Sequence, residues 1–256
     1  MRKNNKAKGP EVKFLIAALI ILLAISLIMG YIWRVLTTSD YFKIKEVVFK
    51  GSGVADLSYL KGKNIFTVDL KSESQDIIEG YPNYDKIRLI RVLPNRIFVD
   101  FVKRVPIAFV KLSRYFAVDE DGVLFYTPEQ PEGTRLPVIL GIQKRINSPK
   151  PGVSYNNIRE LALAINIAKE AAKNKNLKDY RIIKIDVTSA SNTSIFMLFS
   201  TEEALEGSEV KFGEGNVKEK INILSGLFTQ GKTALSNIKY IDLRFNEPVI
   251  KLKNVK

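Results

Sequence analysis

The fold is decided by residues 86–110, KIRLIRVLPNRIFVDFVKRVPIAFV, in which two runs of alternating apolar and polar side chains flank a proline. Alternation with a period of two is typical of a β-strand with one buried face. We therefore predict strands at Lys86–Leu93 and Arg96–Lys103, joined in a hairpin at Pro94. Pro106 fits a point where the second strand ends and the chain enters another domain.

The segment before this hairpin completes a small unit of helices and strands. Phe42–Gly51 alternates apolar and charged residues, which predicts a strand. A short helix is expected within Leu57–Phe66, with Gly62 ending it, and a second over Ser72–Gly80, which has a serine cap, an acidic first turn and a terminal glycine. The order strand, helix, helix, strand, strand predicts two helices packed on a three-stranded sheet.

The chain after this unit predicts a larger domain that is rich in strands. Amphipathic helices are expected at Asn156–Asn174 and Val217–Phe228. Strands are expected at Ile107–Lys111, Tyr115–Val118, Val123–Tyr126, Leu136–Gly141, Tyr180–Thr188, Ser194–Phe199, Val210–Phe212, Ile238–Phe245 and Val249–Leu252. The sequence thus predicts an α+β fold whose C-terminal β domain carries its helices on one face.

An apolar run near the N-terminus, Phe14–Trp33, predicts a membrane anchor. Its twenty uncharged residues would span roughly 30 Å as a helix, the thickness of a bilayer's hydrocarbon core. A cleaved signal peptide is the nearest alternative, but the run lacks an Ala-x-Ala site and continues to bulky Tyr31 and Trp33. The predicted order is a cytoplasmic basic tail (1–13), a transmembrane helix (14–33), a linker (34–41), a first domain (42–110) and a C-terminal β domain (111–256).

The charge distribution predicts the orientation of this helix. The chain has a formal net charge of +13, of which residues 1–13 contribute +4 and the rest of the chain +9. The positive-inside rule keeps the basic tail in the cytoplasm and exports everything after the helix. The exported charge would then face anionic lipid, wall polymers or acidic partner segments, and no nucleic acid.

Composition and motifs favour a binding protein over an enzyme. The 256 residues include no cysteine and no histidine, which removes thiolate and imidazole chemistry and the usual zinc and haem ligands. Residues 226–233, GLFTQGKT, match the P-loop pattern, but helical spacing precedes them where a P-loop needs a strand, so we interpret the match as a helix C-terminus. Asp119, Glu120 and Asp121 are interpreted as a solvated hairpin turn. We expect no catalytic residue, metal, cofactor or small-molecule substrate.

The order of these motifs resembles the FtsQ/DivIB family of bacterial cell-division proteins. FKIKEVVFKG (42–51), a Tyr-Pro pair (81–82), RVLPNRIFVDFVKRVPIAFV (91–110) and DEDGVLF (119–125) are similar to that family's POTRA domain and the start of the next domain. YIDLRFNEPVIKLK (240–253) is similar to the end of its extracytoplasmic region. The chain departs at Lys103, where the family often has an acidic residue. The resemblance implies that residues 42–110 form a POTRA domain.

The resemblance also implies a function, a location and partners. It implies a single-pass scaffold of the division septum in the bacterial cytoplasmic membrane, with its N-terminus in the cytoplasm. FtsB and FtsL, both bitopic, would be its partners, and through them it would control septal peptidoglycan synthesis by FtsW and FtsI. The family's contact region corresponds to YIDLRFNEPVI (240–250), where a partner segment would add a strand to the sheet edge. The candidate partner-binding residues are Arg244, Phe245, Val249 and Ile250.

The residues alone leave other interpretations open. Arg244 could pair with a partner carboxylate or simply be solvated at a strand end, and residues 241–245 alternate as they would if one face were core. A POTRA-bearing polypeptide-transport component is a second function class, although such proteins usually carry several POTRA repeats and a barrel. A signal-anchored envelope enzyme is a third, disfavoured by the missing histidine and cysteine.

Overall fold

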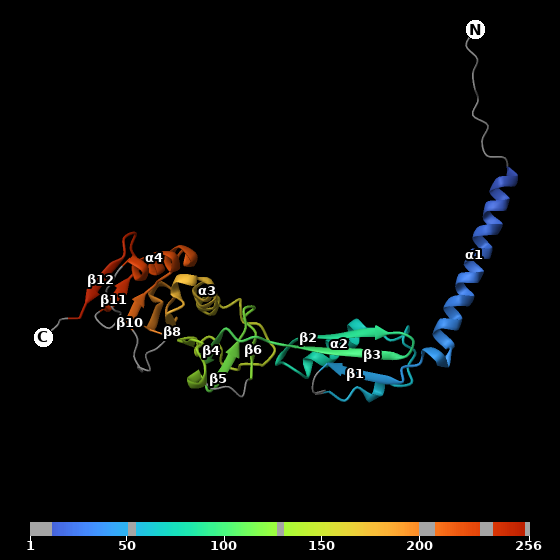
Figure 1. Cartoon of the computed structure of the whole chain (residues 1–256), viewed down its shortest axis with the longest axis horizontal. Coiled ribbons are helices and arrows are strands. Elements are labelled where there is room, and N and C mark those ends of the chain that lie inside the picture. Colours follow the sequence, from blue (N-terminus) through green and yellow to red (C-terminus); the bar gives the residue numbers. More distant parts are fainter. Residues whose placement is uncertain (1–11, 51–54, 127–130, 200–207, 231–237, 254–256) are drawn as a thin grey trace, which may run out of the picture. The chain divides into compact units, whose positions relative to one another are not determined.

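The structure, a computed structural model, describes residues 12–50, 55–126, 131–199, 208–230 and 238–253. The chain divides into two compact units. The first consists of Met1–Ile78 and Lys86–Val102, and the second of Glu79–Asp85 and Lys103–Lys256. Both units mix helices and strands, as Figure 1 shows along the chain, which confirms the predicted α+β class.

The apolar run forms the helix α1 (Val12–Thr38), as predicted. This helix is long and apolar enough to cross a membrane, and its most apolar part is not buried against other described residues. It continues past Trp33 because no helix breaker follows. The Thr38 hydroxyl donates to the Arg34 carbonyl at 2.7 Å and so satisfies one of the carbonyls in the last turn.

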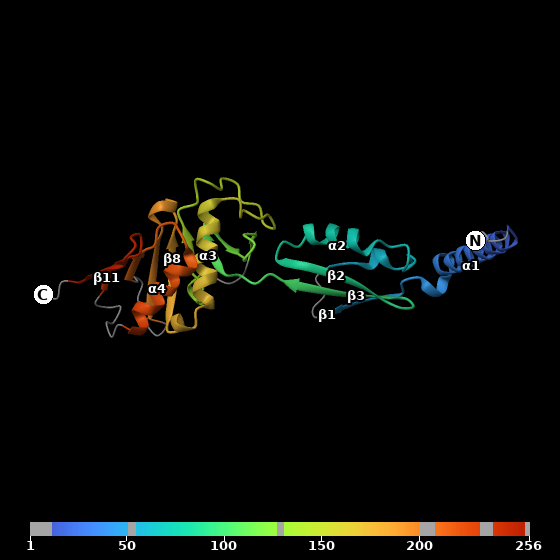
Figure 2. The same cartoon turned by 90° about the horizontal axis from the view of Figure 1, so that it is seen from above.

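The described part of the first unit is built on three strands. They are β1 (Glu46–Lys50), β2 (Tyr84–Val92) and β3 (Arg96–Lys103), in the order β1-β3-β2, with β1 parallel to β3. Helix α2 (Leu70–Glu79) lies on one face of this sheet (Figure 2), where the Ser74 hydroxyl donates to the Ile87 carbonyl at 2.8 Å. Buried apolar side chains of this unit include Ile44, Leu57, Leu60, Ile65, Val68, Ile77, Ile87, Ile97 and Val99.

The structure differs from the prediction in one element of this unit. The first of the two predicted helices is a single 3-10 turn, η2 (Ser58–Leu60). The chain cannot continue as a helix because the residues that follow pair with the segment before β1. The amide of Gly62 donates to the Ile44 carbonyl, and the amide of Ile65 donates to the Phe42 carbonyl, both at 2.9 Å. This pairing also explains why β1 begins at Glu46 and not at Phe42.

The described part of the second unit forms one nine-stranded sheet with two α-helices, α3 (Arg159–Lys173) and α4 (Val217–Gln230). The strand order is β12-β11-β10-β9-β8-β7-β4-β5-β6. The strands are β4 (Ala108–Lys111), β5 (Tyr115–Val118), β6 (Leu124–Phe125), β7 (Val138–Leu140), β8 (Tyr180–Asp186), β9 (Ser194–Phe199), β10 (Ser208–Lys211), β11 (Ile238–Asp242) and β12 (Val249–Leu252).

The positions of the two helices follow from two pairs of parallel neighbouring strands in this sheet. β7 is parallel to β8, and β10 is parallel to β11. Parallel neighbours need a long crossover connection, which α3 supplies for the first pair and α4 for the second. Both helices cover the same face of the sheet (Figure 2), as predicted. Leu161 and Ile167 of α3 and Leu224 of α4 are fully buried there.

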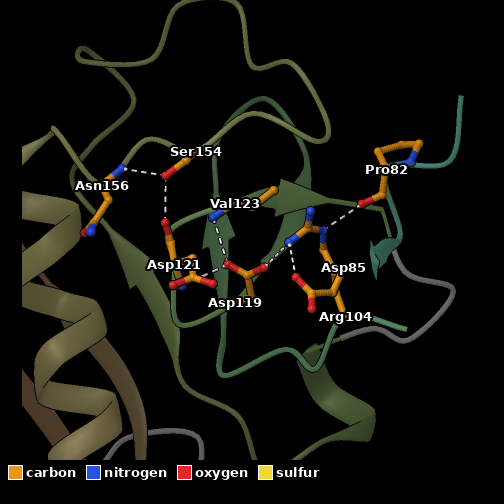
Figure 3. A network of polar contacts seen from close by, with 8 residues as sticks. All are labelled: Pro82, Asp85, Arg104, Asp119, Asp121, Val123, Ser154 and Asn156. Atoms are coloured by element: carbon orange, nitrogen blue, oxygen red, sulfur yellow. Dashed lines mark hydrogen bonds and ion pairs between the residues drawn. The ribbon is translucent and has the colours of Figure 1, made fainter. Parts of the chain in front are cut away.

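A buried ion pair holds the segment Glu79–Asp85 in the second unit (Figure 3). Arg104 Nη1 lies 2.6 Å from Asp119 Oδ2, and their side chains are only 11% and 9% exposed. Arg104 Nε donates to the Pro82 carbonyl at 3.1 Å, and Asp85 Oδ1 lies 3.6 Å from Nη1. Asp119 Oδ1 accepts from the amide of Val123 at 2.9 Å. One guanidinium therefore connects this segment to the turn between β5 and β6.

The interpretation of residues 119–121 as a solvated turn is wrong for Asp119. Glu120 is exposed and pairs with Lys169 at 2.5 Å, as a solvated turn residue would. Asp119 is buried because Arg104, from a separate strand end, neutralises it. A buried carboxylate is tolerated only when it is paired and hydrogen-bonded, and Asp119 is both.

We predict that Asp119→Asn lowers the free energy of unfolding by about 3 kcal/mol, because it leaves the buried Arg104 charge with only the more distant and more exposed Asp85 as a counterion. Chemical denaturation of the full chain in detergent measures this loss. Asp121→Asn is the matched control, since Asp121 is in the same turn, exposed, and joined to it through its backbone groups. Equal stability of the two variants would contradict the structural role of the pair.

Candidate functional site

The candidate site is the edge of the nine-stranded sheet that is formed by β12. β11 pairs antiparallel with β12, with Ile241 opposite Ile250 and Asp242 opposite Val249. Among the described strands, β12 has β11 as its only neighbour. The outer backbone edge of β12 therefore presents N–H and C=O groups that can pair with a further strand.

The side chains of this edge are exposed, and all of those in β12 except Lys251 are apolar. All four residues of β12 are exposed, including Val249 (47%) and Ile250 (44%). Phe245, in the turn before β12, is 63% exposed. An apolar edge strand open to solvent is a template for association with another chain. Three of the four predicted contact residues, namely Phe245, Val249 and Ile250, thus lie at one accessible edge.

Arg244, the fourth predicted residue, is held by a neighbour within the chain. Its Nε and Nη2 donate to the two carboxylate oxygens of Asp242 at 2.9 and 2.7 Å, and its Nη1 donates to Asn192 Oδ1 at 2.9 Å. The Arg244 guanidinium also lies 6.0 Å from the centre of the Phe245 ring. This fork geometry fixes the turn that leads into β12. Sequence reasoning missed Asp242 and Asn192 in this role.

Two lysines lie around Tyr240 beside the apolar edge. The Nζ atoms of Lys211 in β10 and Lys251 in β12 lie 4.4 and 6.0 Å from the centre of the Tyr240 ring. Tyr240 and Lys251 are opposite each other in the β11–β12 register. Such cation–π contacts keep the lysines on the sheet surface. The alternation within 240–252 was the signal that could have identified Tyr240 and Lys251.

The charge pair also sets an electrostatic feature of the site. The hydrogen bonds from Arg244 lower the pKa of Asp242 below its ordinary value of 3.8, although burial of the carboxyl acts in the opposite direction. A carboxyl with a lowered pKa in the folded state contributes stability above its unfolded pKa. That contribution is lost as the pH falls from about 4 through the lowered pKa.

We predict that Asp242→Asn destabilises the chain by about 1–2 kcal/mol at pH 7, because charge-assisted hydrogen bonds to Arg244 are lost. The difference from the unsubstituted chain should shrink below pH 4, where Asp242 becomes protonated. Thermal unfolding across pH 3–7 measures both effects. Glu247→Gln, which removes an exposed acid from the same turn, is the control for the loss of an acidic side chain. A constant difference at all pH values would contradict the pairing.

The other motifs do not assemble a catalytic site in the described residues. Gly226, the first glycine of the P-loop match, lies within α4 and not after a strand, and Gly231, Lys232 and Thr233 lie outside the described residues. No group of three or more histidine, cysteine or acidic side chains that could hold a metal ion occurs in the part of the chain that the structure describes. The groove between α3 and α4 is open and lined mainly by asparagine and lysine side chains.

Comparisons with known proteins show which family the chain is similar to. Residues 108–244 match the family described as Cell division protein FtsQ/DivIB, C-terminal. The chain is 24% identical over 229 residues to the cell division protein FtsQ of Geotalea daltonii, covering 86% of this chain and 80% of that protein. It is 25% identical over 224 residues to FtsQ of Syntrophotalea carbinolica, covering 85% and 76%. The family match ends at Arg244, just before β12.

Proposed function

The chain belongs to the FtsQ/DivIB family of cell-division proteins, and from this premise we propose that it is a membrane-anchored scaffold of the division septum. In this proposal α1 crosses the cytoplasmic membrane with the basic tail in the cytoplasm, and both compact units lie outside. The basic excess of residues 1–13 supports this orientation. The scaffold would link early and late division proteins through binding alone.

The proposed partners are FtsB- and FtsL-like bitopic proteins, and the proposed contact is strand addition at β12. The observation that supports this most is the apolar edge formed by Phe245, Val249 and Ile250, whose outer backbone faces no described strand. A partner strand would gain main-chain hydrogen bonds from β12 and side-chain contacts from the apolar residues. Through these partners the scaffold would regulate septal peptidoglycan synthesis by FtsW and FtsI.

Arg244 stays a predicted contact residue, with a more specific role. Because its guanidinium already binds Asp242 on one edge, its proposed task is to position Phe245 and the turn before β12. A partner carboxylate would share the guanidinium with Asp242. The nearby lysines Lys211 and Lys251 extend the positive charge along the sheet surface. A partner strand that carries acidic residues beside its apolar ones therefore fits this edge best.

We predict that cells depleted of this protein grow as filaments, and that a copy with a fluorescent protein at its N-terminus forms midcell rings and restores division. A copy with Ile250→Glu should fail to restore division, because it places a charge on the apolar edge that the partner strand covers. Cell length and ring frequency are the measurements. The purified full chain with Ile250→Glu should bind the FtsB–FtsL pair at least about tenfold more weakly than the unsubstituted chain does.

Val105→Glu is the matched control, because Val105 is also an exposed apolar residue (73%) but lies outside the β11–β12 edge. It should restore division as the unsubstituted copy does. Normal division after depletion would contradict the division role itself. If Ile250→Glu restores division as well as Val105→Glu does, only the contact at β12 is contradicted.

A further inference from the structure

The first unit exposes a group of apolar and aromatic side chains near the end of α1. We name this group the lipid-facing tip and define it as Tyr41, Tyr59, Val92 and Leu93. Tyr41 and Leu93 are 63% and 58% exposed, and Tyr59 and Val92 are also exposed. Single exposed apolar residues are ordinary in proteins. These four come from separate segments of the chain, so their position relative to the membrane helix decides whether they form one surface.

Two consecutive residues, Asn64 and Ile65, connect the end of α1 to the β2–β3 hairpin through hydrogen bonds. The Asn64 side-chain amide donates to the Leu36 carbonyl of α1 at 2.8 Å. The next carbonyl, that of Ile65, accepts from Arg91 Nε at 2.7 Å. Arg91 directly precedes Val92 and Leu93 at the hairpin turn. The turn is therefore connected to α1 through one short loop.

Tyr41 and Tyr59 adjoin the two segments, residues 42–44 and 62–65, that pair with each other near the end of α1. The amide of Lys45 donates to the Asn95 carbonyl in the hairpin turn at 2.8 Å. The Tyr59 hydroxyl donates to Glu73 at 2.7 Å, which fixes the ring beside Lys63, whose Nζ lies 4.9 Å from the ring centre. In both Figure 1 and Figure 2 the β2–β3 turn lies at the end of the first unit from which α1 departs.

The depth of this end follows from helix geometry. The apolar run ends at Trp33, and Leu36 lies three residues later, which is about 4.5 Å further along a helix axis. The headgroup region on each side of the hydrocarbon core is of order 5–8 Å thick. The loop bonded to Leu36 is thus at headgroup level wherever α1 crosses a bilayer. Aromatic side chains and flanking lysines, here Lys45 and Lys61, are the residue types that favour this region.

We propose that the lipid-facing tip rests in the phospholipid headgroup layer, with Leu93 inserted as its apolar anchor and the flanking lysines beside anionic lipid. The first unit would then contact the membrane through its own surface, in addition to being attached to it through α1. This contact rests on α1 crossing a membrane and on neither the division role nor the contact at β12. It holds on whichever side of the membrane the unit lies.

The test uses the absence of native cysteine. Leu93→Cys and Val105→Cys each create one labelling site for the environment-sensitive fluorophore NBD in the full chain. Both positions are exposed and apolar, but Val105 follows the far end of β3. The labelled chains are placed in nanodiscs of mixed zwitterionic and anionic phospholipid. Circular dichroism of both variants checks that the exposed-site substitutions leave the fold intact.

Dithionite should reduce NBD at position 93 at least about threefold more slowly than at position 105, because headgroup burial shields the label from the aqueous reagent. A lipid with a nitroxide headgroup should quench position 93 and leave position 105 bright. Equal reduction rates at the two positions would overturn the proposal. Slow reduction at position 93 without nitroxide quenching would also overturn it, because the shield would then be protein and not lipid.

Discussion

The requirement that every backbone group in a sheet find a partner is the main constraint on the proposed site, because the nine-stranded sheet ends at β12, which has no second neighbour among the described strands. β12 completes the pairing of β11 and leaves its own outer edge open among the described strands. An open apolar edge promotes indiscriminate association unless it is short or charged. β12 is four residues long and carries Lys251. These features limit self-association and agree with the proposal that β12 binds a specific partner.

Two arginine–aspartate pairs support this arrangement in a chain that has no cysteine for disulfide bonds. Arg244 and Asp242 fix the turn that sets the direction of β12. Arg104 and Asp119 hold the segment 79–85 in the second unit. In each pair a buried carboxylate accepts a hydrogen bond from a guanidinium that also binds another polar group. Local order at the proposed partner-binding edge therefore depends on the Arg244–Asp242 pair.

Local sequence patterns were sufficient to predict most strands and helices. They did not predict contacts between residues that are far apart in the sequence. The alternation of 238–252 indicated both strands of the edge, and the resemblance to the FtsQ/DivIB family implied the candidate contact residues on it. The burial of Asp119 was missed because its partner, Arg104, lies outside the turn. The pairing of residues 62–65 with 42–44 replaced a predicted helix by a turn, since tertiary hydrogen bonds outweigh a weak local preference. The placement of β7 between β4 and β8 likewise has no local signal.

Amide hydrogen exchange of the full chain in nanodiscs, with and without the FtsB–FtsL pair, tests the central claim most directly. Strand addition would cover the outward amides of β12, so the account predicts that their exchange slows when the partners bind, while exchange in α3 stays constant. Unchanged exchange in β12, together with protection that appears elsewhere on the chain, would contradict the account.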